Sequence, residues 1–184
     1  MSVELPLLGE PVSVEFANTL YGEFDFLDEP ETARSWVAEV VPGHALPEDG
    51  LTELRNAVRR IFLAVSAGAA LDSADVRLVN ECAAAAPSVW QLTSGATAAQ
   101  TRIGARVLLA ELAEDCVRVV ASADVHPVRL CESDDCPMLF VRKHHRRRWC
   151  HNSCGHRVRQ AAYYRRTQAW GRRLPGHGAD GRPS

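Results

Sequence analysis

The sequence predicts a mainly α-helical protein with a helical N-terminal domain, one or two short strands, and a small C-terminal module made of a short β-ribbon and a helix. Three observations support this fold class. Apolar residues recur at helical spacing through much of residues 30–121, four cysteines cluster within residues 131–154, and the two parts of the chain carry opposite charge. The 184 residues, 46% of them hydrophobic and 24% charged, are typical of a globular chain with one or two domains.

The first elements follow from local patterns. Residues 12–16 alternate apolar and polar side chains, which predicts a short strand with one buried face. A helix is expected to begin with Pro30 in its first turn and to end at Pro42-Gly43. The clearest helix covers residues 51–65, where the apolar residues share one face and three arginines point away from it.

The second half of the N-terminal domain combines two helices and a strand. A helix from Asp72 or Ser73 to about Ala86 is followed by a short strand at residues 88–92. Thr97-Ala98-Ala99-Gln100 has the form of a capping box, which predicts that a long helix begins there and continues to about Ala121. Cys82 and Cys116 lie on the apolar faces of these helices, so we expect them to be core residues.

Charge divides the chain into two parts. Residues 1–125 hold 8 Arg against 19 Asp and Glu, a net charge of −11, whereas residues 126–184 hold 13 basic and 4 acidic residues, a net charge of +9. We therefore expect an acidic helical domain over residues 1–124 and a basic module over residues 127–172. Residues 173–184 are polar and rich in Gly and Pro, which predicts a disordered tail.

Cys131, Cys136, Cys150 and Cys154 form two close pairs separated by thirteen residues. Two pairs of thiolates at this spacing can complete the tetrahedral shell of a structural Zn²⁺ ion. Disulfides or unconnected thiols are the alternatives. Disulfides are disfavoured in the reducing cytoplasm, where we expect the protein because the sequence has neither an export signal nor a membrane span. A histidine could also replace one cysteine, since His144, His145, His151 and His156 lie nearby.

The module is expected to fold as a short β-ribbon followed by a helix. The ribbon would pair residues 138–142 with residues 146–149, and the helix would begin near Cys154 with Asn152 or Ser153 as its cap. Residues 129–173 carry 12 basic and 3 acidic residues, which favours a polyanionic partner over a merely solvated surface. The side chains expected to contact nucleic acid are Arg142, Lys143, Arg146, Arg147 and Arg148 on the ribbon, and Arg157, Arg159 and Arg166 on the helix.

The module resembles the CGNR zinc-finger family. The resemblance rests on the four cysteines, on the stretch Arg147-Arg148-Trp149-Cys150, and on Cys154-Gly155-His156-Arg157, where His156 stands in place of the Asn of the family signature. The N-terminal part is similar to the ABATE domain, through residues 14–19, Trp36 and the helix around residues 54–63. The resemblance implies a bacterial DNA-binding transcription regulator whose N-terminal domain senses a small-molecule effector or a partner.

Several expectations about function follow. Double-stranded DNA is the expected partner, with an RNA-binding module or a zinc-stabilised protein–protein adaptor as alternatives. Asn18 and Thr19 could line an effector pocket, although Asn18 could equally cap a helix. The sequence does not settle the oligomeric state, although the long helix from Thr97 offers enough apolar surface for a homodimer. The sequence contains no pattern of a nucleophile with its base and no phosphate-binding loop, so an enzyme is not expected.

Overall fold

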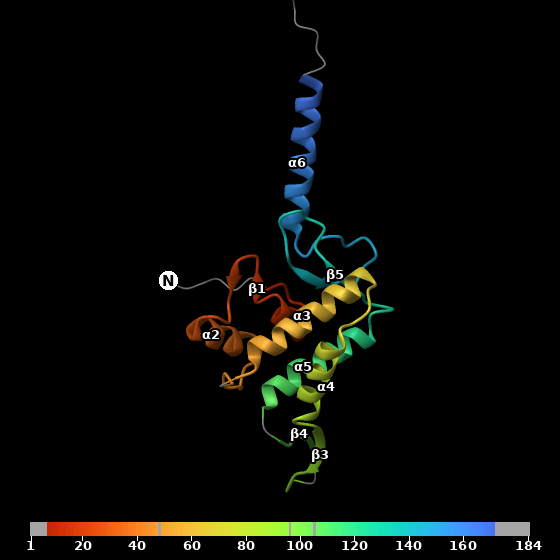
Figure 1. Ribbon diagram of the computed structural model, residues 1–184. Coiled ribbons are helices and arrows are strands. Elements are labelled where there is room, and N and C mark those ends of the chain that lie inside the picture. The colour runs from red at the N-terminus through yellow and green to blue at the C-terminus, as the bar shows by residue number, and fades with distance from the viewer. Residues whose placement is uncertain (1–6, 48, 96, 105, 172–184) are drawn as a thin grey trace, which may run out of the picture.

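The computed structural model describes residues 7–47, 49–95, 97–104 and 106–171. Helices and short antiparallel hairpins make up the fold of these residues (Figure 1). The helices are α1 (Val12–Ala17), α2 (Pro30–Val40), α3 (Leu51–Ala67), α4 (Ser73–Ala84), α5 (Val107–Ala121) and α6 (Asn152–Gly171). The strands are β1 (Leu20–Tyr21), β2 (Phe24–Asp25), β3 (Ser88–Leu92), β4 (Ala98–Arg102), β5 (Val128–Leu130) and β6 (Leu139–Val141). The disordered tail predicted for residues 173–184 lies outside the described residues.

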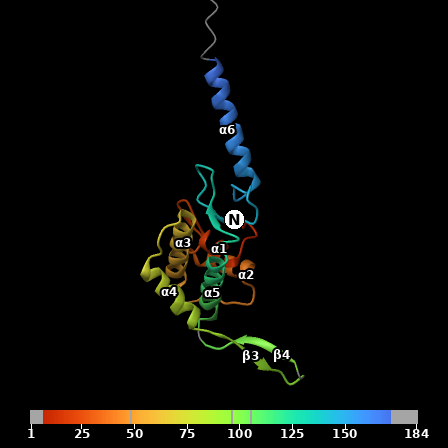
Figure 2. The same ribbon diagram turned by 90° about the vertical axis from the view of Figure 1, so that its right-hand side faces the viewer.

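Helix α3 is the centre of the helical body, the name used here for the described part of residues 7–126. It packs against α1, α4 and α5, as the two views show (Figures 1 and 2). Leu54, Val58 and Phe62 recur at helical spacing and are fully buried, which confirms the predicted apolar face. The predicted helices α2 and α4 are confirmed, and Cys82 and Cys116 are buried in the core as expected.

The strand predicted at residues 12–16 is wrong, because these residues form helix α1. Both polar residues of the alternating pattern are buried together with the apolar ones. The Ser13 backbone N–H donates to the Asp115 carboxylate at 2.8 Å, and Glu15 accepts backbone hydrogen bonds from Leu8 and Glu10. A six-residue helix that is buried on nearly all sides does not show the polar face that periodicity analysis needs.

The long helix predicted from Thr97 begins ten residues later, at Val107. Residues 98–102 form strand β4, which pairs with the correctly predicted β3 from Ser88↔Arg102 to Leu92↔Ala98. Gly104 has a φ of +136°, and a Cβ there would collide with the carbonyl oxygen of Ala85. This glycine therefore separates the hairpin from α5, and the apparent capping box belongs to the strand.

One strand of the predicted ribbon is confirmed, because residues 139–141 form β6, but its partner strand is wrong. β5 pairs with β6 in the register Val128↔Val141 to Leu130↔Leu139, whereas residues 146–149 form turns and bends. The inner side chains of this ribbon, Val128, Leu139 and Val141, belong to the same hydrophobic core as α1 and α3. The zinc module (residues 128–171) is thus packed on the helical body.

Helix α6 extends away from the rest of the molecule (Figures 1 and 2). Among its described residues only Cys154 and Gly155, in the first turn, are buried. At about 1.5 Å per residue, its twenty residues span about 30 Å. None of the described helices is both long and apolar enough to cross a membrane.

Candidate metal centre

The four cysteines are brought together by the ribbon and by the start of α6. Cys131 follows β5, Cys136 precedes β6, and Cys150 and Cys154 lie just before and within the first turn of α6. Short turns fix this arrangement: the Cys136 N–H donates to the Ser133 carbonyl at 2.9 Å, and the Cys154 N–H donates to the His151 carbonyl at 3.2 Å. The helix is capped by the ring of His151, whose Nδ1 lies 3.3 Å from the Ser153 N–H, and not by Asn152 or Ser153 as predicted.

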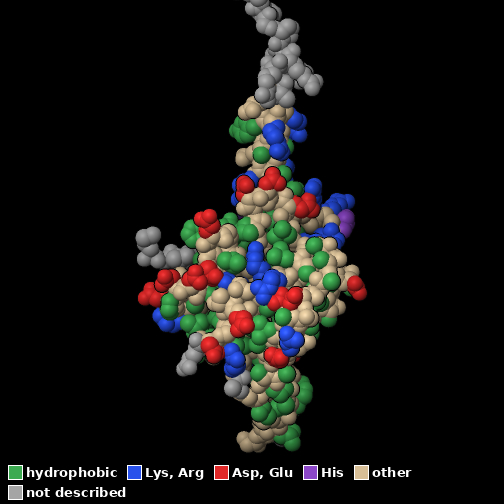
Figure 3. All heavy atoms as spheres, in the orientation of Figure 1, with side chains coloured by type: hydrophobic (Ala, Val, Ile, Leu, Met, Phe, Trp, Pro, Cys, Tyr) green, Lys and Arg blue, Asp and Glu red, His purple; other side chains and the backbone are tan. Residues whose placement is uncertain are grey.

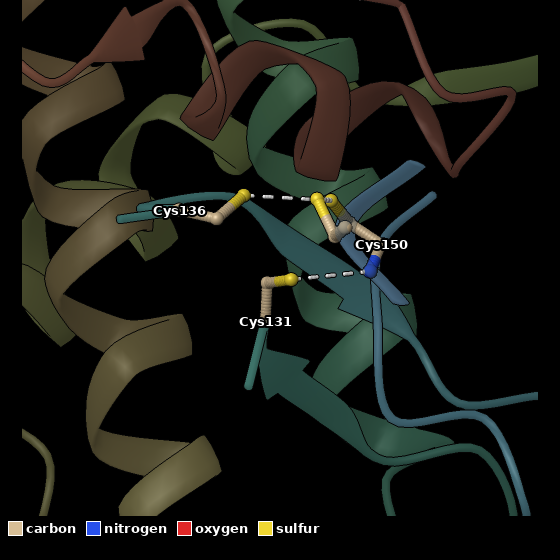
Figure 4. Close-up of side chains that lie close together, drawn as sticks. Cys131, Cys136 and Cys150 are labelled. Atoms are coloured by element: carbon tan, nitrogen blue, oxygen red, sulfur yellow. Dashed lines mark hydrogen bonds between the residues drawn. The ribbon is translucent and has the colours of Figure 1, made fainter. Parts of the chain in front are cut away.

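The four sulfur atoms form a compact buried cluster, and all of them lie within 4.8 Å of one another. The Sγ atoms of Cys136 and Cys150 are 3.6 Å apart (Figure 4). Those of Cys150 and Cys154 are 3.7 Å apart. A tetrahedron with Zn–S bonds of about 2.3 Å requires S···S separations of about 3.8 Å. A disulfide bond is about 2.05 Å long, so these thiols are not paired covalently. The geometry fits a Zn²⁺ ion held by four cysteines.

The pKa values of the clustered thiols show why the site needs a cation. In the absence of metal, the hydrogen bond with Cys150 lowers the pKa of Cys136 to about 5. The same hydrogen bond, together with burial, raises the pKa of Cys150. Burial also raises the pKa of Cys131. Several thiolates cannot coexist at this separation without a positive charge between them, and a divalent ion supplies that charge.

Two further contacts stabilise thiolates at the cluster. The Cys150 N–H donates to the Cys131 sulfur at 3.4 Å, and the Arg157 guanidinium donates to the Cys154 sulfur at 3.2 Å. The four nearby histidines are exposed, and among the described residues only the cysteines form a metal-binding group. The alternative of a histidine ligand is therefore not supported. All four ligand positions are occupied by protein, which is typical of structural rather than catalytic zinc sites.

Comparison with known protein families agrees with this geometry. The family described as "Putative stress-induced transcription regulator" (ABATE) matches residues 10–123. The chain belongs to this family. The CGNR zinc finger matches residues 128–167, which include all four cysteines. No curated protein matches the chain. The helical body is thus an ABATE domain, and the zinc module is a CGNR zinc finger.

The structure explains two residues of the CGNR signature. Gly155 lies against the indole of Trp149, where a Cβ would come within 2.8 Å of the ring. Arg157 contacts the Cys154 sulfur, so its charge is used at the metal centre. His156, which replaces the Asn of the signature, is exposed and does not contact the cluster.

Three polar residues of the ABATE domain attach it to the zinc finger. Glu10 pairs with Arg147 at 2.6 Å and also accepts the Val141 N–H. The Asn18 amide exchanges two 2.9 Å hydrogen bonds with the backbone of Leu139. Sequence reasoning did not assign these roles to Glu10 and Asn18.

Arg59 is the third of these attachment residues. It donates to the carbonyl of Ala17 at the end of α1, at 3.0 Å, and to that of Pro137 beside Cys136, at 2.9 Å. The sequence predicted that Arg59 faces away from the core. In the structure it lies half-buried between the helical body and the module.

Asn18 and Thr19, the residues expected at a pocket, are both buried and hydrogen-bonded within the protein. Asn18 is the C-cap of α1, which agrees with a capping role, although at the end of a helix and not at its start. The Thr19 hydroxyl donates to the Phe16 carbonyl at 2.7 Å and accepts from Arg55 at 3.2 Å. A role of this pair in effector binding stays a prediction.

The eight basic residues expected to contact nucleic acid fall into two groups. Arg147, Arg148 and Arg157 have partners within the protein. Arg147 binds Glu10 and three backbone carbonyls and lies over the Phe140 ring, whereas Arg148 pairs with Glu132. Within the described part of the chain, the other five form no ion pair, and these are Arg142, Lys143, Arg146, Arg159 and Arg166.

Proposed function

We propose that this protein is a zinc-dependent DNA-binding transcription regulator. In this proposal the CGNR zinc finger contacts DNA, and zinc holds the basic loop (residues 142–149) and helix α6 in a fixed relation. The observation that carries the proposal is the position of α6, a long basic helix that leaves the body just beyond the zinc ligands (Figure 1).

The charge of this region supports a polyanionic partner. Residues 136–179 contain no Asp or Glu. Lys and Arg are visible along α6 and on one flank of the zinc finger, beside histidine (Figure 3). Cations on a helix without acidic neighbours repel one another, and phosphates would relieve that repulsion.

The five unpaired cations define the expected contact surface. Arg142, Lys143 and Arg146 lie on the basic loop, and Arg159 and Arg166 lie seven residues apart on α6. Arg147 and Arg157 are expected to support this surface from within, because their guanidinium groups are already engaged. Phosphate contacts of this kind position a protein on DNA, whereas base contacts would add sequence preference.

Binding to a labelled random-sequence duplex, measured by fluorescence anisotropy at several salt concentrations, tests the proposal. Neutralisation of about five phosphates predicts a slope of about −4 to −5 for log K against log salt. The combined variant Arg142→Ala/Arg146→Ala and the variant Arg159→Ala/Arg166→Ala should each weaken binding and reduce that slope by about 2. The matched control Arg34→Ala/Arg77→Ala removes two exposed arginines from the ABATE domain and should leave affinity unchanged.

The alternatives give different results in the same assay. An RNA-binding module, which could stack bases on the exposed Tyr163 and Tyr164, would bind single-stranded RNA more tightly than duplex DNA in competition. A protein–protein adaptor would bind neither. Absence of duplex binding, or equal effects of the test and control variants, would overturn the proposal.

A further inference from the structure

The β3–β4 hairpin projects from the ABATE domain at the end opposite α6 (Figures 1 and 2). Its two strands pair with each other, and within the described residues neither strand has a second neighbour in a sheet. An isolated two-stranded hairpin is only marginally stable in water, so a projecting hairpin would gain stability from packing against a partner.

The hairpin exposes apolar side chains and carries almost no charge. Trp90 and Leu92 are 70% and 87% exposed, and they lie on one face because they are two residues apart in β3. Residues 82–101 include no Asp, Glu, Lys or Arg, although 24% of the chain is charged. The projection accordingly lacks the red and blue of charged side chains over most of its visible surface (Figure 3). Exposed strands in monomeric proteins usually carry charges that prevent association.

The base of the hairpin is fixed to the helical body. Arg102, the last residue of β4, donates to the Ala86 carbonyl at 2.9 Å and pairs with Glu111 and Glu114 of α5. Ile103 donates its N–H to the Pro87 carbonyl at 3.2 Å. The apolar face is therefore held in a fixed direction and does not fold back onto the body.

We propose that the hairpin face carrying Trp90 and Leu92 packs against the same face of a second copy of this chain. Charges buried against an uncharged face would lack partners, so this face favours an uncharged partner, and the same hairpin of a second copy is such a surface. A two-fold contact places the same face on both sides of the interface, so no opposite charges are needed. The contact also lies far from the zinc finger, so both basic surfaces of the dimer remain accessible.

The expected dimer is small and reversible. Each tryptophan can bury about 150–250 Å². Two of them, with Leu92 from each copy, give an interface at the low end of specific contacts, below about 1,200 Å². The dimer contact is thus assigned to the hairpin and not to the long helix considered from the sequence. Residues 98–102 of that helix are strand, and the apolar side of α5 is buried in the core.

Sedimentation velocity on the full-length, zinc-loaded protein across a wide concentration range, without DNA, tests the inference. The wild type should show a reversible monomer–dimer equilibrium. Trp90→Lys and Leu92→Lys should each raise the dimer dissociation constant by at least about tenfold, because each introduces a like-charge pair across the two-fold contact. Phe24→Lys is the matched control, since Phe24 is an aromatic residue that is 72% exposed on β2, away from the hairpin.

Zinc content and circular dichroism identify any variant that fails to fold, and the more conservative Trp90→Gln then takes its place. A wild-type protein that stays monomeric at all concentrations would overturn the inference. A dimer that Phe24→Lys weakens as much as Trp90→Lys, or that neither hairpin variant weakens, would also overturn it. DNA binding is not part of this readout, so a failure here is distinguishable from a failure of the proposed function.

Discussion

Glu10 joins the ABATE domain to the zinc finger through both of its carboxylate oxygens. One oxygen pairs with Arg147 and the other accepts the Val141 N–H, and the side chain is only 1% exposed. Glu10→Gln keeps the shape but removes the charge that faces Arg147. We expect this change to lower the free energy of unfolding by about 1–3 kcal/mol, because the partly buried Arg147 loses its charged partner. Urea denaturation followed by circular dichroism measures the change.

The exposed pair between Glu132 and Arg148 is the matched comparison for Glu10. Both side chains of this pair are about half-exposed or more. Exposed ion pairs contribute about 0–1 kcal/mol, so Glu132→Gln should cost much less stability than Glu10→Gln. Equal costs for the two variants would show that the Glu10 contact does not hold the two parts together.

Glu15 gives the protein a pH dependence of a defined sign. Burial raises the pKa of Glu15 above its ordinary value of 4.5, against hydrogen bonds from the backbone of Glu10 and Leu8 that lower it. One of its carboxylate oxygens has no hydrogen-bond partner in the described structure. The folded state therefore binds the proton more tightly than the unfolded chain, and Glu15 contributes stability below pH 4.5 that is lost as pH rises through the raised pKa.

Glu15→Gln removes this ionisation. The free energy of unfolding of the variant minus that of wild type should increase as pH rises from below 4.5 to neutrality, because only the wild type loses the contribution of protonated Glu15. Urea denaturation at a series of pH values measures the difference, and exposed Glu31→Gln controls for the loss of one negative charge. A difference that is constant with pH, or that changes in the opposite direction, would contradict the assignment.

At the scale of elements, helix α6 is attached to the zinc finger by a close contact between Gly155 and Trp149. The guanidinium carbons of Arg148 and Arg159 also lie over the Trp149 ring, 5.5 and 5.7 Å from its centroid. In Gly155→Ala the added Cβ would approach the indole to 2.8 Å, which requires the ring or the helix to shift. The better helix propensity of Ala, about 1 kcal/mol, does not offset such a displacement beside two metal ligands.

We therefore expect Gly155→Ala to release zinc more readily, as measured by a chromogenic chelator, and to lower the melting temperature. Gly95→Ala is the control, because its Cβ would meet only the Thr93 hydroxyl oxygen at 4.0 Å. Zinc retention equal to wild type in Gly155→Ala would show that α6 does not depend on this contact.

The sequence predicted those elements that bury one face and expose the other. Helices α2, α3 and α4 have such a face, and the short strand predicted at residues 88–92 is β3. Helix α1 was predicted as a strand because its polar residues are buried too. Both strands of the ribbon were predicted after Cys136, whereas its first strand, β5, precedes Cys131. A strand of three residues is too short to show a detectable periodicity.

At the scale of the whole molecule, cysteine spacing predicted the metal centre but not how that centre is attached. Four thiols at short intervals identify a zinc site because the ligands are close in sequence. The hydrogen bonds of Asn18 with Leu139 span 121 residues, and Glu10 reaches Val141 across 131 residues. Contacts of this kind depend on the folded arrangement of distant segments, and no local pattern indicates them. The sequence therefore suggested two separate units, whereas the ribbon shares the core of the ABATE domain.

This shared core predicts that zinc stabilises the ABATE domain as well as the zinc finger. Zinc contributes about 10–16 kcal/mol of apparent binding free energy in small modules, and its removal should release β5 and β6 from α3 and α1. Hydrogen exchange with mass spectrometry, with and without a strong chelator, should show lost protection in α1 and α3 as well as in residues 128–171. Cys116→Ala, which changes a buried core cysteine outside the cluster, should respond to the chelator as the wild type does. If protection is lost only in residues 128–171, the two parts fold independently and metal occupancy cannot be communicated to the ABATE domain.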